Sequence, residues 1–333
     1  APGEVKFIHR TAPEADIYFV FNYSAQTRTL TLGFRQRDRL PELWDARTGE
    51  RAPAPICSPT AHGVELPLSL EPWGSMFVVF RRPLPERFVA AIDGADWRVG
   101  AAGVTTTARE LTLRDAANRS REVVLPALPA AVALDGPWQV EFKDGRGAPP
   151  SAEFPVLQSW SEHRDAGIRF YSGTAVYRRR VTVPRWGEDQ RAVLDLGRVA
   201  DIARVFVNGH DAGVAWNEPF RIDVTRWLRT GDNDVEIHIA NRWINRLIGD
   251  EAIDDGLKFQ RAGVSKFTDG RLLELPAWLY DASRRGERKR HSFHTWKHYD
   301  ADSPLVPAGL LGPVRLEWVT RLASDALARA VSQ

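Results

Sequence analysis

Short apolar runs of strand length, separated by turns rich in Gly, Pro, Asn and Asp, make up most of this chain. Residues 204–225, RVFVNGHDAGVAWNEPFRIDVT, show the pattern most clearly. Val205 and Val207 point to one face of a strand, and Asn208-Gly209 supplies the two positive φ angles of a type I′ hairpin turn. Long amphipathic helical patterns are scarce. Because two-residue periodicity with frequent turns is typical of β-proteins, the sequence predicts an all-β fold.

The predicted strands fall into groups that indicate two or three antiparallel β-sandwich units. Residues 1–82 contain five predicted strands, and we expect them to form a compact sandwich. Residues 83–130 begin with a Pro-bounded stretch and read as a small β-hairpin unit with a linker. Residues 131–320 contain at least eight predicted strands, typical of a jelly roll with a long inserted loop. Residues 321–333 form a helical tail, predicted to be either a docking helix or a frayed end.

Composition excludes several classes of partner. The formal net charge is +2, which is too small to draw in nucleic acid or an anionic membrane surface. The apolar runs fall short of the roughly 18 residues that a membrane-spanning helix needs. Cys57 is the single cysteine, so an internal disulfide and a cysteine metal cluster are excluded. We therefore expect no nucleic acid and no membrane among the partners.

One connection, from about residue 246 to 312, is far longer than the others and is therefore expected to be functional. It begins with the acidic run GDEAIDD. Carboxylates in a loop are the ligands that calcium prefers, so Asp250, Glu251 and Asp254 are candidate ligands of a calcium ion. The alternative is an acidic surface turn whose carboxylates pair with Arg242 or Arg246.

The same connection continues into HSFHTWKHYDADSP, which combines aromatic and polar side chains. Sugars are bound by flat aromatic faces against their C–H surfaces and by charged donors to their hydroxyls. The candidate sugar contacts here are His294, Trp296, Lys297 and Tyr299. The alternative is a strand whose aromatic side chains pack on the long loop. A site in which three histidines bind zinc is less favoured, because residues on one strand face rarely complete a tetrahedron.

Longer stretches resemble known glycoside hydrolases. VFVNGHDAGVAWNEPFRIDVTRWLRTGDNDVEIHIAN resembles the sugar-binding, galactose-binding-like jelly-roll domain of glycoside hydrolase family 2. NRWINRLIGDE and HSFHTWKHYDADSPLVPAGLLGPVRLEW resemble the C-terminal part of glycoside hydrolase family 106, the α-L-rhamnosidases. DIYFVFN, PELWDARTGE and PWGSMFVVFRR resemble the β-sandwich that follows the catalytic barrel in that family. The resemblance covers most of the chain and is most specific from 173 to 318.

The resemblance implies an accessory role. Members of family 106 carry their catalytic carboxylates on an N-terminal (β/α)8 barrel, and this chain shows no alternation of strands and helices for one. We therefore expect a non-catalytic C-terminal region that supports the barrel and is inactive alone. The resemblance also implies a rhamnose-containing glycoside as ligand, a periplasmic or secreted location, and a sugar-binding loop end at Trp216, Asn217 and Glu218.

Two alternatives to the accessory role remain open on sequence alone. A freestanding carbohydrate-binding module or lectin would bind oligosaccharides without a barrel. A purely structural or interaction β-protein would bind no sugar but would expose a large apolar face. A complete catalytic pair of carboxylates within this chain is not expected, since acids in turns are mostly solvated or capping residues.

Overall fold

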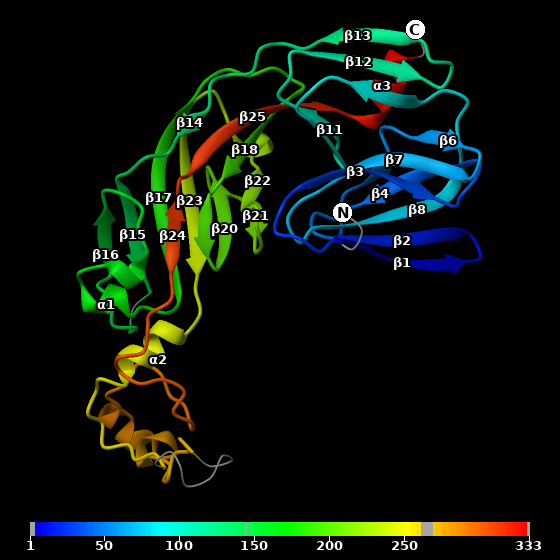
Figure 1. The fold of residues 1–333 in the computed structure, drawn as a ribbon. Coiled ribbons are helices and arrows are strands. Elements are labelled where there is room, and N and C mark those ends of the chain that lie inside the picture. Colours follow the sequence, from blue (N-terminus) through cyan, green and yellow to red (C-terminus); the bar gives the residue numbers. More distant parts are fainter. Residues whose placement is uncertain (1–3, 144, 261–268, 332–333) are drawn as a thin grey trace.

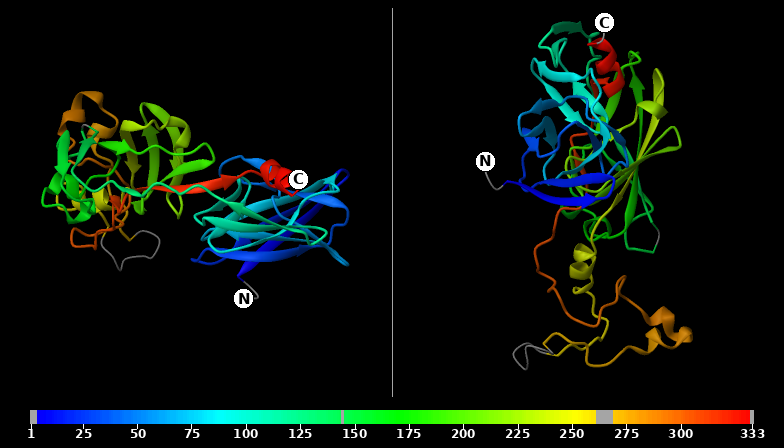
Figure 2. Two further views of the ribbon diagram at one scale, coloured as in Figure 1. Left: turned by 90° about the horizontal axis from the view of Figure 1, so that it is seen from above. Right: turned by 90° about the vertical axis from the view of Figure 1, so that its right-hand side faces the viewer.

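The computed structural model describes residues 4–143, 145–260 and 269–331. Every named strand pair in these residues is antiparallel. The predicted all-β class with antiparallel sandwich units is confirmed. Figure 1 shows two β-rich units lying side by side, and Figure 2 shows from above that one C-terminal strand runs from the second unit into the first.

The first unit contains three sheets. One has the order β1 (Val5–Ala12), β2 (Ala15–Asn22), β8 (Ser75–Pro83), β4 (Arg39–Trp44) and β5 (Arg51–Pro53). Facing it are β3 (Arg28–Phe34), β7 (Gly63–Leu70) and β6 (Ser58–Thr60). The third is β13 (Ser120–Val124), β12 (Glu110–Asp115) and β9 (Val89–Asp93). Alternate residues of β7 are buried, as the two-residue period of a strand requires.

The core of the first unit extends beyond residues 1–82. Leu111 and Leu113 of β12 and Leu125 after β13 join the same buried cluster as Leu66 and Leu68 of β7. The segment 83–130, which the sequence suggested as a unit of its own, therefore shares one core with the sandwich before it. A hairpin alone cannot bury enough apolar surface to be stable in water, so its apolar face packs on the sandwich.

The second unit is a sandwich of two larger sheets. Its outer sheet has the order β16 (Ser151–Phe154), β15 (Trp138–Phe142), β17 (Thr174–Val183), β23 (Gly231–Ala240), β20 (Ile202–Val207) and β21 (His210–Ala215). Opposite lie β14 (Val132–Ala133), β25 (Arg315–Leu322), β18 (Gln190–Asp195) and β22 (Arg221–Asp223), with the small pair β19 (Arg198–Ala200) and β24 (Gly309–Gly312). Trp138, Tyr177 and Leu316 are buried between the sheets.

Strand β25 belongs to both units. Its first part pairs with β18, and its end pairs with β11 (Gly103–Thr106), which continues to β10 (Trp97–Gly100). Arg321 and Leu322 are therefore strand residues, although the sequence assigned them to the helical tail, because β11 offers them an unpaired edge. The helix α3 (Ser324–Ala330) then places Leu327 in the core of the first unit.

The long connection leaves the second unit after α2 (Ile244–Asp250) and returns at β24. We call residues 251–308 the excursion, of which 261–268 lie outside the described residues. Two short 3₁₀ helices, η3 (Ala277–Leu279) and η4 (Ala282–Glu287), are its regular elements in the described part. Figure 1 shows it projecting beyond the lower end of the second unit, away from the first. None of the described helices is long and apolar enough to cross a membrane.

We predict that the buried side chain of Leu327, near the C-terminal end of the sequence, stabilises the core of the first unit. Leu327→Ala removes a side chain that is 2% exposed and should lower the free energy of unfolding by about 2–4 kcal/mol, the usual effect of a buried Leu→Ala change. Cys57 lies in the same core, and burial raises the pKa of its thiol to about 12. Labelling of Cys57 by a thiol reagent in rising urea therefore reports opening of this unit.

The matched control is Asp325→Ala, which changes an exposed residue on the same helix. The midpoint for Cys57 labelling should move to lower urea with Leu327→Ala and stay in place with the control. Equal midpoints for the two variants would contradict a structural role for α3 in the first unit.

Candidate functional site

The hairpin β20–β21 has the turn that its sequence predicts. Asn208 and Gly209 have φ angles of 51° and 80°, as a type I′ turn requires. The Asn208 side chain donates hydrogen bonds to the Trp227 carbonyl at 2.9 Å and to the Asn233 side-chain oxygen at 2.8 Å. The Asn-Gly pair therefore fixes the backbone and ties the hairpin to its neighbours, which leaves the following loop as the candidate binding element.

The loop between β21 and β22 faces the first unit. Trp216 is 60% exposed and lies with Asn217 on the wall of a cavity of about 280 Å³. The opposite wall comes from the first unit and includes Trp73, which is 48% exposed, and Arg98. Glu218 is exposed and lies outside the lining of this cavity. Two of the three residues predicted for this loop therefore face the same cavity as a second exposed tryptophan.

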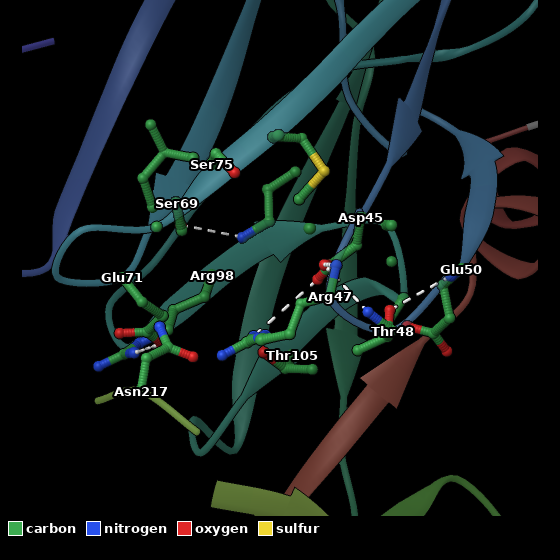
Figure 3. A pocket seen from close by; sticks show the side chains of 18 of the residues that line it. Asp45, Arg47, Thr48, Glu50, Ser69, Glu71, Ser75, Arg98, Thr105 and Asn217 are labelled. Carbon is green, nitrogen blue, oxygen red and sulfur yellow. Dashed lines mark hydrogen bonds and ion pairs between the residues drawn. The ribbon is translucent and has the colours of Figure 1, made fainter. Parts of the chain in front are cut away.

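On the first unit's side, the cavity is lined by charged side chains that form ion pairs and hydrogen bonds with their neighbours (Figure 3). The Arg98 guanidinium contacts the Glu71 carboxylate at 2.7 Å, and the other Glu71 oxygen accepts a hydrogen bond from Thr27 at 2.8 Å. Asp45 accepts hydrogen bonds from the backbone N–H groups of Arg47 at 2.8 Å and Thr48 at 3.3 Å. The wall on this side therefore contains both hydrogen-bond donors and acceptors.

Two wider chambers between the units, of about 730 and 930 Å³, share lining residues with this cavity. Arg47 and Thr105 line all three spaces, and Asn217 lines two of them. We call the combined space the inter-unit cleft. Its floor is the face of β18 and β25 that points away from the core of the second unit, where Val193 and Val319 lie.

Sequence reasoning missed the first-unit wall of the cleft. Trp73 has a φ of 55° in the turn before β8, and nothing in its neighbourhood relates it to a loop more than a hundred residues later. A stretch such as EPWGS indicates a turn, but the side toward which that turn faces is set by the packing of the two units. The signal that could have helped is the aromatic residue at a turn, where an exposed ring is unusual.

The excursion brings together several charged residues that the sequence analysis had singled out. The Glu251 carboxylate contacts Arg290 at 2.8 Å and His294 at 3.2 Å, and Lys297 lies 3.9 Å away. Arg290 also binds Asp255. Burial lowers the pKa of Arg290, but hydrogen bonds to the two carboxylates outweigh it and raise that pKa above its ordinary value. We call Glu251, Asp255, Arg290 and His294 the buried ion cluster.

The predicted sugar contacts in the excursion divide into two groups. His294 faces inward, because one ring nitrogen lies 2.6 Å from the Trp296 carbonyl and its ring stacks on Phe259 at 5.6 Å. Lys297 and Tyr299 line a shallow pocket of about 520 Å³ beside Phe259. Trp296 pairs with Arg271 through its backbone. The alternative in which aromatic side chains pack on the long loop therefore describes His294, while Lys297 and Tyr299 remain candidate contacts.

The proposed calcium ligands do not converge. Asp250 accepts hydrogen bonds from the Ser292 backbone at 2.7 Å and hydroxyl at 2.6 Å, and its other oxygen lies 3.0 Å from Arg246. Glu251 faces Arg290, and Asp254 is exposed. In the described part of the chain, no group of three or more His, Cys, Asp or Glu residues could hold a metal ion. As they lie, Asp250, Glu251 and Asp254 do not form a donor set that fits calcium. Calcium binding therefore stays a prediction from the sequence alone.

Pairing of Asp250 with Arg246 was the alternative to calcium, and the structure contains this pair. It differs from the expectation in being buried, with both side chains at most 6% exposed. Burial lowers the pKa of Arg246, and the facing carboxylate partly offsets this effect. The pair therefore lies within α2, and the hydrogen bonds from Ser292 to Asp250 connect the excursion to this helix.

We predict that Arg290 holds the excursion together. Arg290→Gln leaves two nearly buried carboxylates, Glu251 and Asp255, without their guanidinium partner, which should destabilise the excursion by about 3 kcal/mol or more. Limited digestion with chymotrypsin, which needs no arginine, should then cut residues 251–308 at least tenfold faster. Arg284→Gln, which breaks an exposed pair with Glu287, is the control and should leave the rate unchanged.

Labelling of Cys57 separates a local effect of the Arg290 variant from a global one. The labelling should be identical in both arginine variants, since this thiol lies in the other unit. Equal cleavage rates for Arg290→Gln and Arg284→Gln would contradict a holding role for the buried ion cluster.

Comparison with known proteins gives two family matches. Residues 1–56 match the alpha-L-rhamnosidase family, and residues 161–310 match the glycosyl hydrolase 2 galactose-binding domain-like family. A putative beta-glucuronidase from Formosa agariphila is 36% identical over 208 residues, which are 62% of this chain and 17% of that protein. The solved structure of a rhamnosidase from Novosphingobium sp. PP1Y has 30% sequence identity and a TM-score of 0.69.

The coverage of these matches is unequal. The likeness to the rhamnosidase extends over 96% of this chain but only 24% of that one, so the chain spans about a quarter of the solved enzyme's length. The resemblance expected from the sequence is confirmed on both family matches and on this structure. The chain is thus a glycoside hydrolase-related protein, similar to an α-L-rhamnosidase along most of its length and, over residues 161–310, to the galactose-binding-like domain of glycosyl hydrolase family 2.

Proposed function

We propose that this chain is the non-catalytic β-sandwich part of an α-L-rhamnosidase-like glycoside hydrolase, and that it binds carbohydrate in the inter-unit cleft. The observation that carries the proposal is the rhamnosidase likeness, which covers 96% of this chain and 24% of the solved enzyme. The resemblance implies that the catalytic barrel is a further part of the same protein. It also implies a rhamnose-containing glycoside and a periplasmic or secreted location, which stay predictions.

The acid groups support the non-catalytic role. Hydrolysis of a glycosidic bond needs two carboxyl groups roughly 5–10 Å apart, one of them with a raised pKa so that it can donate a proton. In the described residues, every carboxyl group with a resolved pKa shift has its pKa lowered. These groups are Asp16, Glu42, Asp115, Asp211, Glu236, Asp281, Glu287 and Asp325. A lowered pKa keeps the group ionised and unfit as a general acid.

The cleft supports the carbohydrate-binding part of the proposal. Trp216 and Trp73 come from the two units, are 60% and 48% exposed, and line the same cavity of about 280 Å³. Sugar rings pack their C–H surfaces on aromatic faces. Glu71, Arg98 and Asn217 offer hydrogen-bond acceptors and donors for hydroxyl groups in the same cavity.

The excursion supports contact with another part of the enzyme. Leu273, Leu275, Leu279 and Tyr280 follow closely in the chain and are 61%, 49%, 43% and 73% exposed. Large apolar side chains gathered in one exposed segment are typical of a surface that another protein surface covers. We assign this segment to the contact with the catalytic barrel.

We predict that the 333-residue chain alone does not hydrolyse an aryl α-L-rhamnoside, whereas a longer form with the preceding barrel does. The reason is that, in the family that the chain resembles, the catalytic carboxylates lie on the barrel. The assay follows release of the phenol by absorbance for both proteins at equal concentration. Robust turnover by the shorter chain would contradict the accessory role.

We further predict that Trp216 carries part of the sugar affinity. Trp216→Ala should weaken binding of rhamnose oligosaccharides by about tenfold, since a stacked aromatic face contributes on the order of 1.4 kcal/mol. Isothermal titration calorimetry measures the affinity. Trp243→Ala is the control, because this ring is also exposed but lies outside the cleft beside Arg146. Equal losses from both variants would place the binding elsewhere.

A further inference from the structure

We propose that the chamber of about 730 Å³ in the inter-unit cleft binds an acidic group, a carboxylate or a sulfate, on the glycan. The inference rests on the proposed carbohydrate binding by the cleft and adds the class of sugar. In this chamber, residues of β18 and β25 form the floor. The loop of the first unit that contains Arg47 lies over it.

The strand period explains why charged groups line this chamber. On β18, Ala192 and Leu194 are buried in the core of the second unit, so Arg191 points to the other face. On β25, the buried Trp318 and Thr320 alternate with Arg321, which also lies on the chamber side. Arg191 and Arg321, one from each of these paired strands, therefore lie on the same surface.

The chamber has an excess of positive charge. Its lining contains Arg47, Arg191, Arg221, Arg226 and Arg321, against two acidic residues, Glu50 and Asp223. Arg221 is neutralised by Glu317 at 2.6 Å and Asp195 at 3.4 Å. Arg321 faces Glu50 at 3.5 Å, and Arg47 lies 3.9 Å from Asp45. Asp223 is engaged by the Thr225 backbone N–H at 2.9 Å and hydroxyl at 2.6 Å, a local turn contact.

Two arginines keep donors for a ligand. The Arg191 guanidinium donates to the backbone carbonyls of Glu188 at 2.6 Å and Gln190 at 3.0 Å through one nitrogen. Arg226 lies over the ring of Trp227 at 4.6 Å. Neither has a carboxylate within ion-pair distance among the residues that the structure describes. A guanidinium has five N–H donors in a planar fork that matches a carboxylate or sulfate, so both retain capacity for such a group.

The rest of the cleft differs in charge, which gives a bound glycan a direction. In the narrow cavity Arg98 and Glu71 neutralise each other beside Trp216 and Trp73. A neutral sugar ring fits that end, and its acidic neighbour along the glycan lies toward Arg191 and Arg226. Asn217 lines both spaces and joins the two ends.

The test compares two disaccharides of equal length, rhamnosyl-rhamnose and glucuronosyl-rhamnose, binding to the full 333-residue chain in calorimetry. We expect the acidic disaccharide to bind at least tenfold more tightly in dilute salt, and the ratio to shrink at 0.5 M NaCl, where exposed charges are screened. Arg191→Gln with Arg226→Gln should lower the affinity for the acidic disaccharide about tenfold. The affinity for the neutral one should change less than about twofold.

The control is Arg10→Gln with Arg198→Gln, which removes the same charge from two exposed residues outside the cleft. It should leave both affinities unchanged, and a thermal melt should give all variants the same midpoint. A glucuronosyl preference that survives in the cleft variant would overturn the assignment to this chamber.

Two other outcomes separate this inference from the proposed function. Equal binding of both disaccharides, with dependence on Trp216, would overturn the acidic-group inference and leave carbohydrate binding in place. Absence of binding for the uronate disaccharide, a sulfated rhamnose disaccharide and the neutral disaccharide alike would overturn both.

Discussion

The pairing of one strand, β25, with two partners holds the molecule together. Residues 315–320 pair with β18 in the second unit, and residues 320–322 pair with β11 in the first. Thr320 is buried and pairs in register with Gln190 of β18 on one side and with Thr106 of β11 on the other. Because one continuous sheet crosses the junction, the two units are joined by backbone hydrogen bonds and not only by a tether. The walls of the cleft are thereby held opposite each other.

Local sequence patterns predicted the features that depend on neighbouring residues, namely turns, strands and fold class. The Asn208-Gly209 turn, the alternating strands and the all-β class follow from dihedral preferences and two-residue periodicity. The loop at Trp216, Asn217 and Glu218 was predicted from the resemblance to the sugar-binding domain, and Trp216 is exposed. The role of β25 was out of reach, because Ala102 and Arg321, which bond across the junction, are 219 residues apart. Neither segment contains a local pattern that predicts its contact with the other.

The same limit explains the outcome at the acidic run. Asp250 and Glu251 have the composition of calcium ligands, but Arg246 and Arg290 reach them in the folded chain. Arg290 comes 39 residues after Glu251, in a basic run that reads as a solvated loop. Composition shows which groups are available, whereas packing decides whether an ion or a guanidinium neutralises them. Buried carboxylates need one or the other.

The cleft and the excursion divide the functional features of the chain. The cleft lies between two β-units that a shared sheet fixes, which suits recognition that needs a constant spacing between walls. The excursion lies beyond the end of the second unit, where its apolar side chains are free to meet another surface. The inter-unit cleft and the exposed apolar segment of the excursion thus lie in different parts of the molecule.

The late position of β25 and α3 has a consequence for synthesis. The first unit is translated early, but its core stays open at the place of Leu327 until the second unit and the excursion have been made. A domain that emerges from the ribosome in this state exposes apolar surface and unpaired strand edges while it waits. Because closure of the first unit depends on this long-range pairing, we expect it to follow the synthesis of α3.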